Sequence, residues 1–392
     1  MNKKNVLELF GGCGGLGYGF HKQNFNIECC NELEQQIANT YIHNYPKSKV
    51  IVGDITENDI KKNIYSHFEN KKCHILIGGP PCVAYSLSGK RDPRDPRGQL
   101  FKDYIEIVER LKPEICIMEN VKGILNMLHD KDNLDTEEKK QADEHYDLEK
   151  KKIILEDKNK HKTITEIEKT ELVELKKLVK ISEKNMSNIR IKVSEKIKKT
   201  FSNIGYNVEY KLLNSANYGV PQLRERVIFI AVRNDLKLNI TFPIATHSKD
   251  ASNNTKKWVS VKEAIDDLKT KDEDKKISHI FSKHSPEFVE KIKNTKCGKA
   301  VNPKYSEANF KCNPNQPSNT VKENHGAVFV HYEKNRSMTP RELARLQSFP
   351  DDFIFKGTKT SILKQLGNAV PCLLSEKIAK NIKNMYNKKQ QK

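Results

Sequence analysis

The sequence predicts an α/β protein with a mainly parallel sheet, a smaller irregular domain and a charged helical insertion. Before residue 122, short apolar runs such as NVLELF, KVIVGDI and CHILIGGPP alternate with helix-length segments. This alternation is typical of parallel strands joined by crossover helices. No glycine stands between Gly123 and Gly205, and no proline between Pro113 and Pro221, which favours long helices in that stretch.

Size, charge and cysteine content narrow the class of protein. The 392 residues suit one large domain with a smaller one, and 70 Lys and Arg against 51 Asp and Glu give a net charge of +19. A basic surface indicates nucleic acid as a partner, with a merely lysine-rich composition as the alternative. Nine cysteines without a CxxC pair indicate a reduced, cytoplasmic protein. No apolar run is long enough to predict a membrane span.

The insertion covers about residues 130–192. Charges of both signs surround weakly periodic apolar residues there, so a protruding helical hairpin is expected, with disorder as the alternative. Apolar residues from Met186 to Ile204 recur at three- and four-residue steps, which predicts a helix with one apolar face.

The second half of the chain begins with two strand-like runs, YNVEYKLL and RVIFIAV. Residues 234–319 then become irregular and rich in Lys, Asn, Ser and Pro, which indicates a loop-rich second domain. A further helix is predicted in TPRELARLQSFPDDF, where Thr339 is a suitable N-cap and Pro340 takes the first helical position.

A glycine-rich turn, FGGCGGLG, follows the first predicted strand and leads into a helix. Glycine allows a tight turn and close approach of a ligand to the backbone, although a purely structural turn is the alternative. Glu32 and Asp54 end the next two strands, so their carboxylates are expected at the same edge of the sheet. Together these features predict a nucleotide-like ligand across the carboxyl ends of the strands.

Cys82 is displayed on a stiff turn, because Pro80 and Pro81 fix φ and lack an N–H group. A nucleophilic cysteine needs a thiolate, and the basic loop that follows supplies positive potential. The four basic residues of that loop are Lys90, Arg91, Arg94 and Arg97. A buried structural cysteine is the alternative for Cys82 taken alone.

Glu119 ends the next strand in MENVKG, which can bring its carboxyl group beside Cys82. In a partly apolar site this group can hold a proton and act as an acid. Arg224 and Arg226 in QLRER stand two residues apart, so a strand would place both on one face, where guanidinium groups bind phosphate or a base carbonyl. Surface ion pairing is the alternative for the two arginines.

The order of these motifs resembles that of the DNA cytosine-5 methyltransferases of bacterial restriction-modification systems. The resemblance covers about residues 6–121 and 194–378, excluding the charged insertion and most of residues 234–315. The blocks that carry it, in family order, are FGGCGG, NELE, GDIT, GGPPCVAYS, ENVKG, QLRER, TPRELARLQSFP and QLGNAVP.

The resemblance implies a Rossmann-like fold that uses S-adenosylmethionine and yields S-adenosylhomocysteine, with no metal and with the target cytosine flipped out of duplex DNA. By family analogy, Cys82 attacks C6, Glu119 protonates N3, and Arg226 holds the base carbonyl beside Arg224. The implied cofactor site comprises Phe10, Gly12, Cys13, Gly14, Glu32, Asp54 and Ile55, with Pro81 and Leu100 at its edge and Asn368, Ala369 and Val370 closing it. The expected DNA contacts are Ser86, Lys90, Arg91, Arg94, Arg97, Gln222 and Thr320.

Three features depart from the family pattern. Val83 replaces the usual Gln after the catalytic cysteine, Cys13 is unusual in the glycine turn, and the insertion is longer than the ordinary helix connection. The first departure puts one loop contact in doubt and leaves the nucleophile intact. The insertion has no functional explanation from the sequence.

The predicted organisation is a catalytic and cofactor-binding domain at 1–233, a target-recognition domain at 234–355, and a segment at 356–392 that returns to the catalytic domain. We expect a bacterial cytoplasmic enzyme that acts as a monomer on nucleoid DNA, with a cognate restriction endonuclease acting separately. A tRNA cytosine methyltransferase and a catalytically inactive DNA-binding protein are the alternatives. Intact Cys82, Glu119 and Arg226 oppose the inactive protein, and the long region after Asn234 favours DNA over tRNA.

Overall fold

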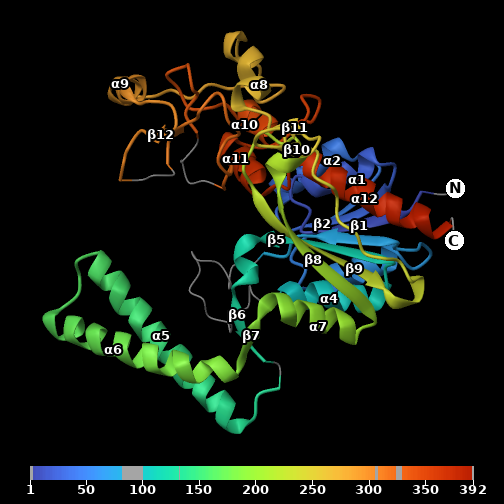
Figure 1. The fold of residues 1–392 in the computed structure, drawn as a ribbon, viewed down its shortest axis with the longest axis vertical. Helices are drawn as coiled ribbons and strands as arrows, with labels where there is room; N and C mark the ends of the chain where they lie inside the picture. The colour runs from blue at the N-terminus through green and yellow to red at the C-terminus, as the bar shows by residue number, and fades with distance from the viewer. Residues whose placement is uncertain (1–2, 82–99, 132, 305–307, 324–328, 391–392) are drawn as a thin grey trace. The chain divides into compact units, whose positions relative to one another are not determined.

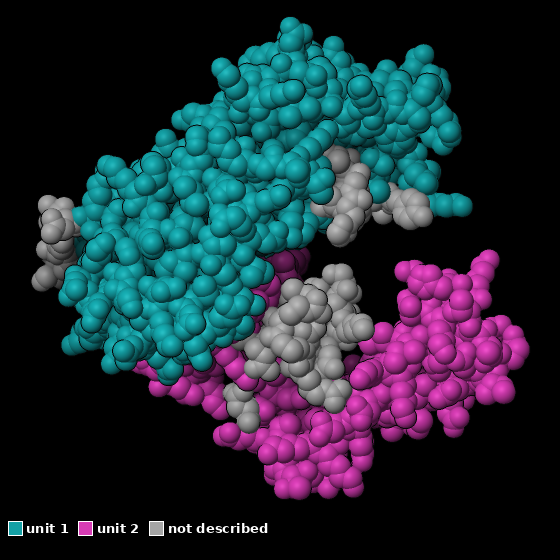
Figure 2. Space-filling view, turned by 180° about the vertical axis from the view of Figure 1, so that it is seen from behind, with its two compact units in different colours: residues 1–80, 106–119, 206–392 teal, residues 81–105, 120–205 magenta. Residues whose placement is uncertain are grey.

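The computed structural model describes residues 3–81, 100–131, 133–304, 308–323 and 329–390 (Figure 1). The chain forms two compact units, which are coloured separately in Figure 2. The first unit comprises Met1–Pro80, Glu106–Glu119 and Tyr206–Lys392, and the second comprises Pro81–Ile105 and Asn120–Gly205. The irregular region predicted at about 234–319 belongs to the same unit as the sheet, and the predicted domain boundaries stay predictions.

A seven-stranded sheet has the strand order β3-β2-β1-β4-β5-β9-β8. The pairs β1/β2, β1/β4, β2/β3 and β4/β5 are parallel, and β8/β9 is antiparallel. This arrangement confirms the predicted α/β fold with a mainly parallel sheet. The strands are β1 (Asn5–Leu9), β2 (Asn26–Glu32), β3 (Lys49–Val52), β4 (Ile75–Gly78), β5 (Ile115–Val121), β8 (Tyr206–Asn214) and β9 (Glu225–Arg233).

Helices α1 (Gly15–Lys22), α2 (Gln35–Asn44) and α12 (Cys372–Gln390) lie over one face of the sheet (Figure 1). Gly19 lets α12 approach α1 closely, because a Cβ atom at this position would lie 2.2 Å from the backbone nitrogen of Glu376. The end of the chain therefore packs against the helix that follows the glycine turn. The other helices of this unit are α3 (Asn58–His67), α8 (Val261–Ile265), α9 (Pro286–Asn294), α10 (Pro340–Leu346) and α11 (Lys359–Asn368).

The region from 234 to 319 is largely irregular, as the sequence predicts. In the described part of this region the strands have only two residues each, namely β10 (His247–Ser248), β11 (Lys256–Lys257), β12 (Lys299–Ala300) and β13 (Phe310–Lys311). The predicted helix start at Thr339 is confirmed, because its side chain caps α10 and Glu342 completes a capping box with Pro340 at the helix start.

The predicted helical hairpin is present in the second unit. Helices α5 (Thr136–Lys160) and α6 (Glu166–Asn185) each begin with a capping box, and Leu155, Leu172 and Leu175 form an apolar cluster between them. The prediction of a helix with one apolar face from Met186 onward is partly wrong. Antiparallel pairing of β6 (Leu128–Asp130) with β7 (Arg190–Lys192) interrupts it, and α7 (Val193–Asn203) begins only after that strand. Helix α4 (Leu100–Leu111) joins β4 and β5 in the chain order.

Candidate active site

The glycine-rich turn leaves β1 in an unusual backbone conformation. Phe10 has φ 56°, and Gly12 and Gly14 have φ 55° and 94°. Positive φ is easy for glycine but rare for other residues, so Phe10 is held there by its surroundings. The hydroxyl group of Tyr45 donates a hydrogen bond to the Gly14 carbonyl at 2.6 Å and helps to fix the conformation of the turn. The turn thus holds the Phe10 backbone in a conformation that it would rarely adopt alone.

Glu32 at the end of β2 ties the next strand to this turn. Its Oε2 atom accepts from the Gly12 backbone N–H at 2.8 Å, and Oε1 accepts from the Glu34 N–H at 3.0 Å. The side chain is only 7% exposed, and this burial raises its pKa. Each carboxylate oxygen retains a further lone pair, so Glu32 can still accept a hydrogen bond from a ligand hydroxyl.

Asp54 and Ile55 follow β3, the next strand in the sheet. The Oδ1 atom of Asp54 accepts from both the backbone N–H and the hydroxyl of Thr56, each at 2.9 Å. These bonds hold the carboxylate in a local turn, while the Ile55 side chain is buried. Polar acceptors therefore stand at the carboxyl ends of β2 and β3, beside the glycine turn after β1, as the sequence predicts for a nucleotide-like ligand.

The segment Asn368–Val370 reaches the start of α1 from the other end of the chain. A Cβ atom on Gly15 would lie 2.4 Å from the Val370 carbonyl, so only glycine permits this approach. Ala369 and Val370 are buried, whereas Asn368 is exposed and donates to Oε2 of Glu323 at 2.9 Å. The two predicted halves of the cofactor site are therefore brought together within one unit.

Cys13, the unusual residue of the turn, packs beneath α11. Its Sγ atom lies 3.8 Å from the Gln365 carbonyl, and the side chain is 1% exposed. Burial raises the pKa of the Cys13 thiol, with the nearby Glu8 as a second cause. This cysteine is consequently a neutral packing group rather than a thiolate.

Glu119 and Arg226 form an ion pair at the ends of neighbouring strands. The Nε atom of Arg226 on β9 lies 2.8 Å from Oε1 of Glu119 on β5, and the two side chains are 14% and 13% exposed. A Cβ atom on Gly79 would lie 3.1 Å from Oε2 of Glu119, so this carboxylate also borders the turn after β4. Cys82 follows Gly79 by three residues.

Arg224 has a different environment from Arg226. It is fully buried, and its Nη1 and Nη2 atoms donate to the carbonyls of Val321 and Gly367 at 2.8 and 3.0 Å. Burial lowers its pKa. The sequence treats the two arginines alike, whereas the structure uses the Arg224 side chain to hold two backbone segments of the protein, and its predicted catalytic role stays a prediction.

Gln222 and Thr320, two of the predicted DNA contacts, bond to other segments of the protein. The Gln222 amide is completely buried, donating to the Leu346 carbonyl and to Gln347 Oε1 and accepting from the Val321 N–H. The Thr320 hydroxyl donates to the Leu223 carbonyl at 2.8 Å. Both side chains join segments of the protein, and their DNA contacts stay predictions.

Several predicted residues cannot be placed in this site. Cys82, Ser86, Lys90, Arg91, Arg94 and Arg97 lie outside the described residues. Pro81 and Leu100 are described but belong to the second unit. Their proposed roles therefore remain predictions.

Glu8 is a residue of the site that the sequence analysis missed. Its Oε1 atom accepts from the Gly17 N–H at 3.0 Å, and Oε2 accepts from the Tyr41 hydroxyl at 2.5 Å. The side chain is 1% exposed, and burial raises its pKa to about 7. An acid within the apolar run NVLELF was the available signal, since an isolated buried carboxyl needs partners.

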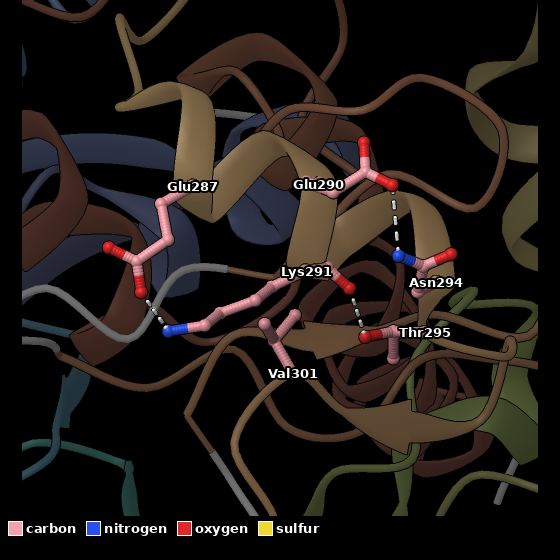
Figure 3. Close-up of a pocket in the computed structure, with 6 residues that line it drawn as sticks. All are labelled: Glu287, Glu290, Lys291, Asn294, Thr295 and Val301. Atoms are coloured by element: carbon pink, nitrogen blue, oxygen red, sulfur yellow. Dashed lines mark hydrogen bonds and ion pairs between the residues drawn. The ribbon is translucent and has the colours of Figure 1, made fainter.

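Elsewhere in the described part of the chain, one pocket of about 440 Å³ lies along α9 (Figure 3). Its polar groups are paired with each other: Glu287 with Lys291 at 2.6 Å, and Glu290 with Asn294 at 3.0 Å. Within the described ranges, no group of three or more His, Cys, Asp or Glu side chains is arranged to hold a metal ion. None of the described helices is both long and apolar enough to cross a membrane.

A glycine-rich turn after the first strand, with acidic residues at the ends of the next two strands, is typical of α/β enzymes that bind a nucleotide-like cofactor. In this protein the ion pair between Glu119 and Arg226 lies on two further neighbouring strands of the same sheet. The family model for C-5 cytosine-specific DNA methylases matches residues 4–151 and 176–384, so the chain belongs to this family. It is accordingly a DNA cytosine-5 methyltransferase, and membership of the family implies S-adenosylmethionine as the methyl donor.

The relatives agree with this family. Type II methyltransferase M1.HphI of Haemophilus parahaemolyticus is 29% identical, with 97% of this chain and 86% of the relative covered. M.DdeI of Desulfomicrobium norvegicum is also 29% identical, with 96% and 88% covered. A crystal structure assigned as a prophage-encoded DNA modification methyltransferase of E. coli has a TM-score of 0.68 at 23% identity, with 98% of this chain and 100% of that chain covered. The structural likeness supports the fold.

Proposed function

We propose that the protein methylates C5 of a cytosine within a specific duplex DNA sequence, as the modification enzyme of a restriction-modification system. The observation that carries the catalytic part is the Glu119–Arg226 pair, 2.8 Å apart beside the turn that leads to Cys82. The two relatives described above are named type II methyltransferases, which supports the biological role. A bacterial cytoplasmic enzyme working as a monomer, with an endonuclease acting separately, completes the proposal.

The residues around the glycine turn suit the proposed binding of S-adenosylmethionine. Glu32 presents a buried carboxylate with lone pairs left for ribose hydroxyls, and the space around a Cβ atom on Gly12 is open to 4 Å. S-adenosylmethionine, when bound, supplies an electrophilic methyl group. The residues proposed to hold it are Phe10, Gly12, Cys13, Gly14, Glu32, Asp54, Ile55, Asn368, Ala369 and Val370, with Pro81 and Leu100 at the edge.

In the proposed reaction, the cytosine leaves the base stack and Cys82 attacks C6 as a thiolate. A C–S bond forms at C6, and the electron pair of the C5–C6 double bond moves to the C4–C5 bond. The C4–N3 pair moves to N3, which takes a proton from Glu119. Arg226 holds both Glu119 and the base carbonyl, where negative charge develops. C5 then takes the methyl group that S-adenosylmethionine would supply, with S-adenosylhomocysteine as the product. Solvent removes the C5 proton, and its electron pair re-forms the C5–C6 double bond while the C–S bond breaks to release the Cys82 thiolate. The N3 proton returns to Glu119, which leaves neutral 5-methylcytosine.

Residues around this centre have supporting roles in the proposal. Arg224 and Gln222 position the chain that carries Arg226, and Thr320 fastens the segment beside it. The proposed DNA contacts come from the loop after Cys82, because lysine and arginine neutralise the phosphates of the DNA backbone. These contacts, to phosphates and to the DNA around the flipped nucleotide, are made by Ser86, Lys90, Arg91, Arg94 and Arg97.

A methyl-transfer assay tests the proposal. Wild-type protein and the Cys82→Ala variant are incubated with labelled S-adenosylmethionine and either duplex DNA or tRNA. Cys297→Ala is the matched control, because Cys297 is an exposed cysteine distant in sequence from every proposed catalytic residue. We expect labelling of DNA by wild type and Cys297→Ala only. Labelling of tRNA in place of DNA, or full activity of Cys82→Ala, contradicts the proposal.

A duplex that contains 5-fluorocytosine tests the covalent step separately. Fluorine at C5 cannot leave as a proton does, so the C–S bond should persist after methyl transfer. We expect a protein–DNA adduct that survives denaturing electrophoresis and requires Cys82. Bisulfite sequencing of methylated plasmid then identifies the recognition sequence.

A further inference from the structure

We infer that Lys364 is a positioning residue of the cofactor site, fastening the loop that carries Glu32 to the segment that carries Asn368. This inference rests on the proposed cofactor site. Lys364 lies on α11 four residues before Asn368, so the two side chains share one helix face. Its Nζ atom lies 2.6 Å from Oε1 of Glu34 and 3.8 Å from Oε1 of Glu323.

The contacts of Lys364 continue to both ends of the site. The Glu34 backbone N–H donates to Oε1 of Glu32 at 3.0 Å, and Oε2 of Glu32 accepts from the Gly12 N–H at 2.8 Å. On the other side, Asn368 donates to Oε2 of Glu323 at 2.9 Å. One ammonium group therefore connects the acidic loop after β2, the end of α11 and the segment at residue 323.

Electrostatics explain why a lysine is needed there. Glu32, Glu34 and Glu323 bring three carboxyl groups to the same neighbourhood, and the hydrogen bond to Glu34 raises the pKa of Lys364, which keeps it charged. Without this charge, the Glu34 and Glu323 carboxylates, which both contact the Lys364 ammonium group, repel each other, and we expect the loop that orients Glu32 to move away from Asn368.

The fold does not depend on Lys364, because other contacts already fasten α2 to the segment before α11. Asn44 donates to the Ile354 carbonyl at 2.8 Å and accepts from its N–H at 3.0 Å. The Lys356 N–H donates to the Thr40 hydroxyl at 2.8 Å. The Lys364, Glu34 and Glu323 side chains are 38%, 43% and 40% exposed, so the ion pairs add little to stability. We therefore expect these ion pairs to affect the geometry of the cofactor site rather than the stability of the fold.

Binding of S-adenosylhomocysteine, measured by calorimetry without DNA, tests the inference. For Lys364→Met we expect affinity weaker by about three- to fivefold at low salt, with the difference vanishing near 1 M salt, as for partly exposed ion pairs. The KM for S-adenosylmethionine should rise while the KM for DNA and the melting temperature stay unchanged. Lys380→Met, an exposed lysine on α12, is the matched control and should behave as wild type.

A charge-reversal pair keeps the test specific to the Glu34 contact. Lys364→Glu should weaken binding more than Lys364→Met, and adding Glu34→Lys should recover part of the loss. Wild-type affinity for Lys364→Met at every salt concentration overturns the inference. Failure of the wild-type protein itself to bind S-adenosylhomocysteine is a different result, because it refutes the proposed cofactor site on which the inference rests.

Discussion

The Nε atom of Arg226 lies 2.8 Å from Oε1 of Glu119, with both side chains about one-seventh exposed. The residues come from β9 and β5, which are neighbours in the sheet although 107 positions separate them in the chain. Arg226 holds Oε1 of Glu119 through a charge-assisted hydrogen bond, and Oε2 of Glu119 lies beside Gly79. Glu119 is thus oriented before any substrate arrives.

Replacement of Arg226 tests this orientation. Arg226→Lys removes the Nε donor and the planar fork that can hold Glu119 and a base carbonyl together. We expect kcat for DNA methylation to fall by about 10²- to 10³-fold, as for loss of one oriented electrostatic group, with S-adenosylhomocysteine affinity unchanged. Arg233→Lys is the control on the same strand, since Arg233 pairs with Asp235. A kcat within twofold of wild type would refute the role of Arg226.

Arg224→Ala separates a positioning role from a catalytic one. The substitution leaves the buried carbonyls of Val321 and Gly367 without their donor and opens a cavity. We expect the free energy of unfolding to fall by about 3 kcal/mol, in the range for such buried losses. Urea unfolding measures it, and Arg226→Ala is the less buried comparison. An unchanged urea midpoint together with a collapsed kcat would instead show that Arg224 acts in the chemistry.

Glu8 predicts a pH dependence of stability. Burial raises its pKa from the ordinary 4.5 to about 7, so between these values the folded protein holds a proton that the unfolded chain has lost. The free energy of unfolding therefore decreases as pH rises through this window, by at most about 1.4 kcal/mol per pH unit, and then levels above pH 7.

Glu8→Gln should remove this decrease, because the amide stays neutral and can still accept from the Gly17 N–H. Urea midpoints of wild type, Glu8→Gln and the exposed control Glu69→Gln at pH 5, 6, 7 and 8 measure the difference. Parallel pH profiles for wild type and Glu8→Gln would show that Glu8 does not titrate in this range.

The helical hairpin is predicted to be separable from DNA methylation. Residues 136–185 contain 13 lysines and 13 acidic residues, so the hairpin contributes none of the net charge of +19. The family model also leaves residues 152–175 unmatched. Leu172→Ala should loosen the Leu155–Leu172–Leu175 cluster and speed proteolysis near Lys160, while the methylation rate and its salt dependence stay unchanged. Leu178→Ala, which is 42% exposed in wild type, is the control. A tenfold loss of DNA affinity in Leu172→Ala would assign the hairpin to DNA binding.

Short-range features of the site were predictable from residues close together in the chain. The glycine turn after NVLELF, the strand ends at Glu32 and Asp54, and the capping box at Thr339 depend on φ preferences and side chain to backbone bonds over a few residues. The alternation of apolar runs and helical segments predicted the parallel sheet. One local prediction was wrong. The 3.6-residue apolar pattern after Met186 predicted a continuous helix, whereas the pairing of β7 with β6 interrupts it.

The sequence by itself determined the class of fold and the residue types available for chemistry. Only the tertiary structure distinguished Arg226 from Arg224, buried Gln222, gave Glu8 its partners and joined Lys364 to Glu34 across 330 positions of the chain. The physical reason is that burial and pairing depend on which distant segments pack together. Backbone preferences act between neighbours, whereas desolvation and ion pairing are set by whatever the fold brings within a few ångströms.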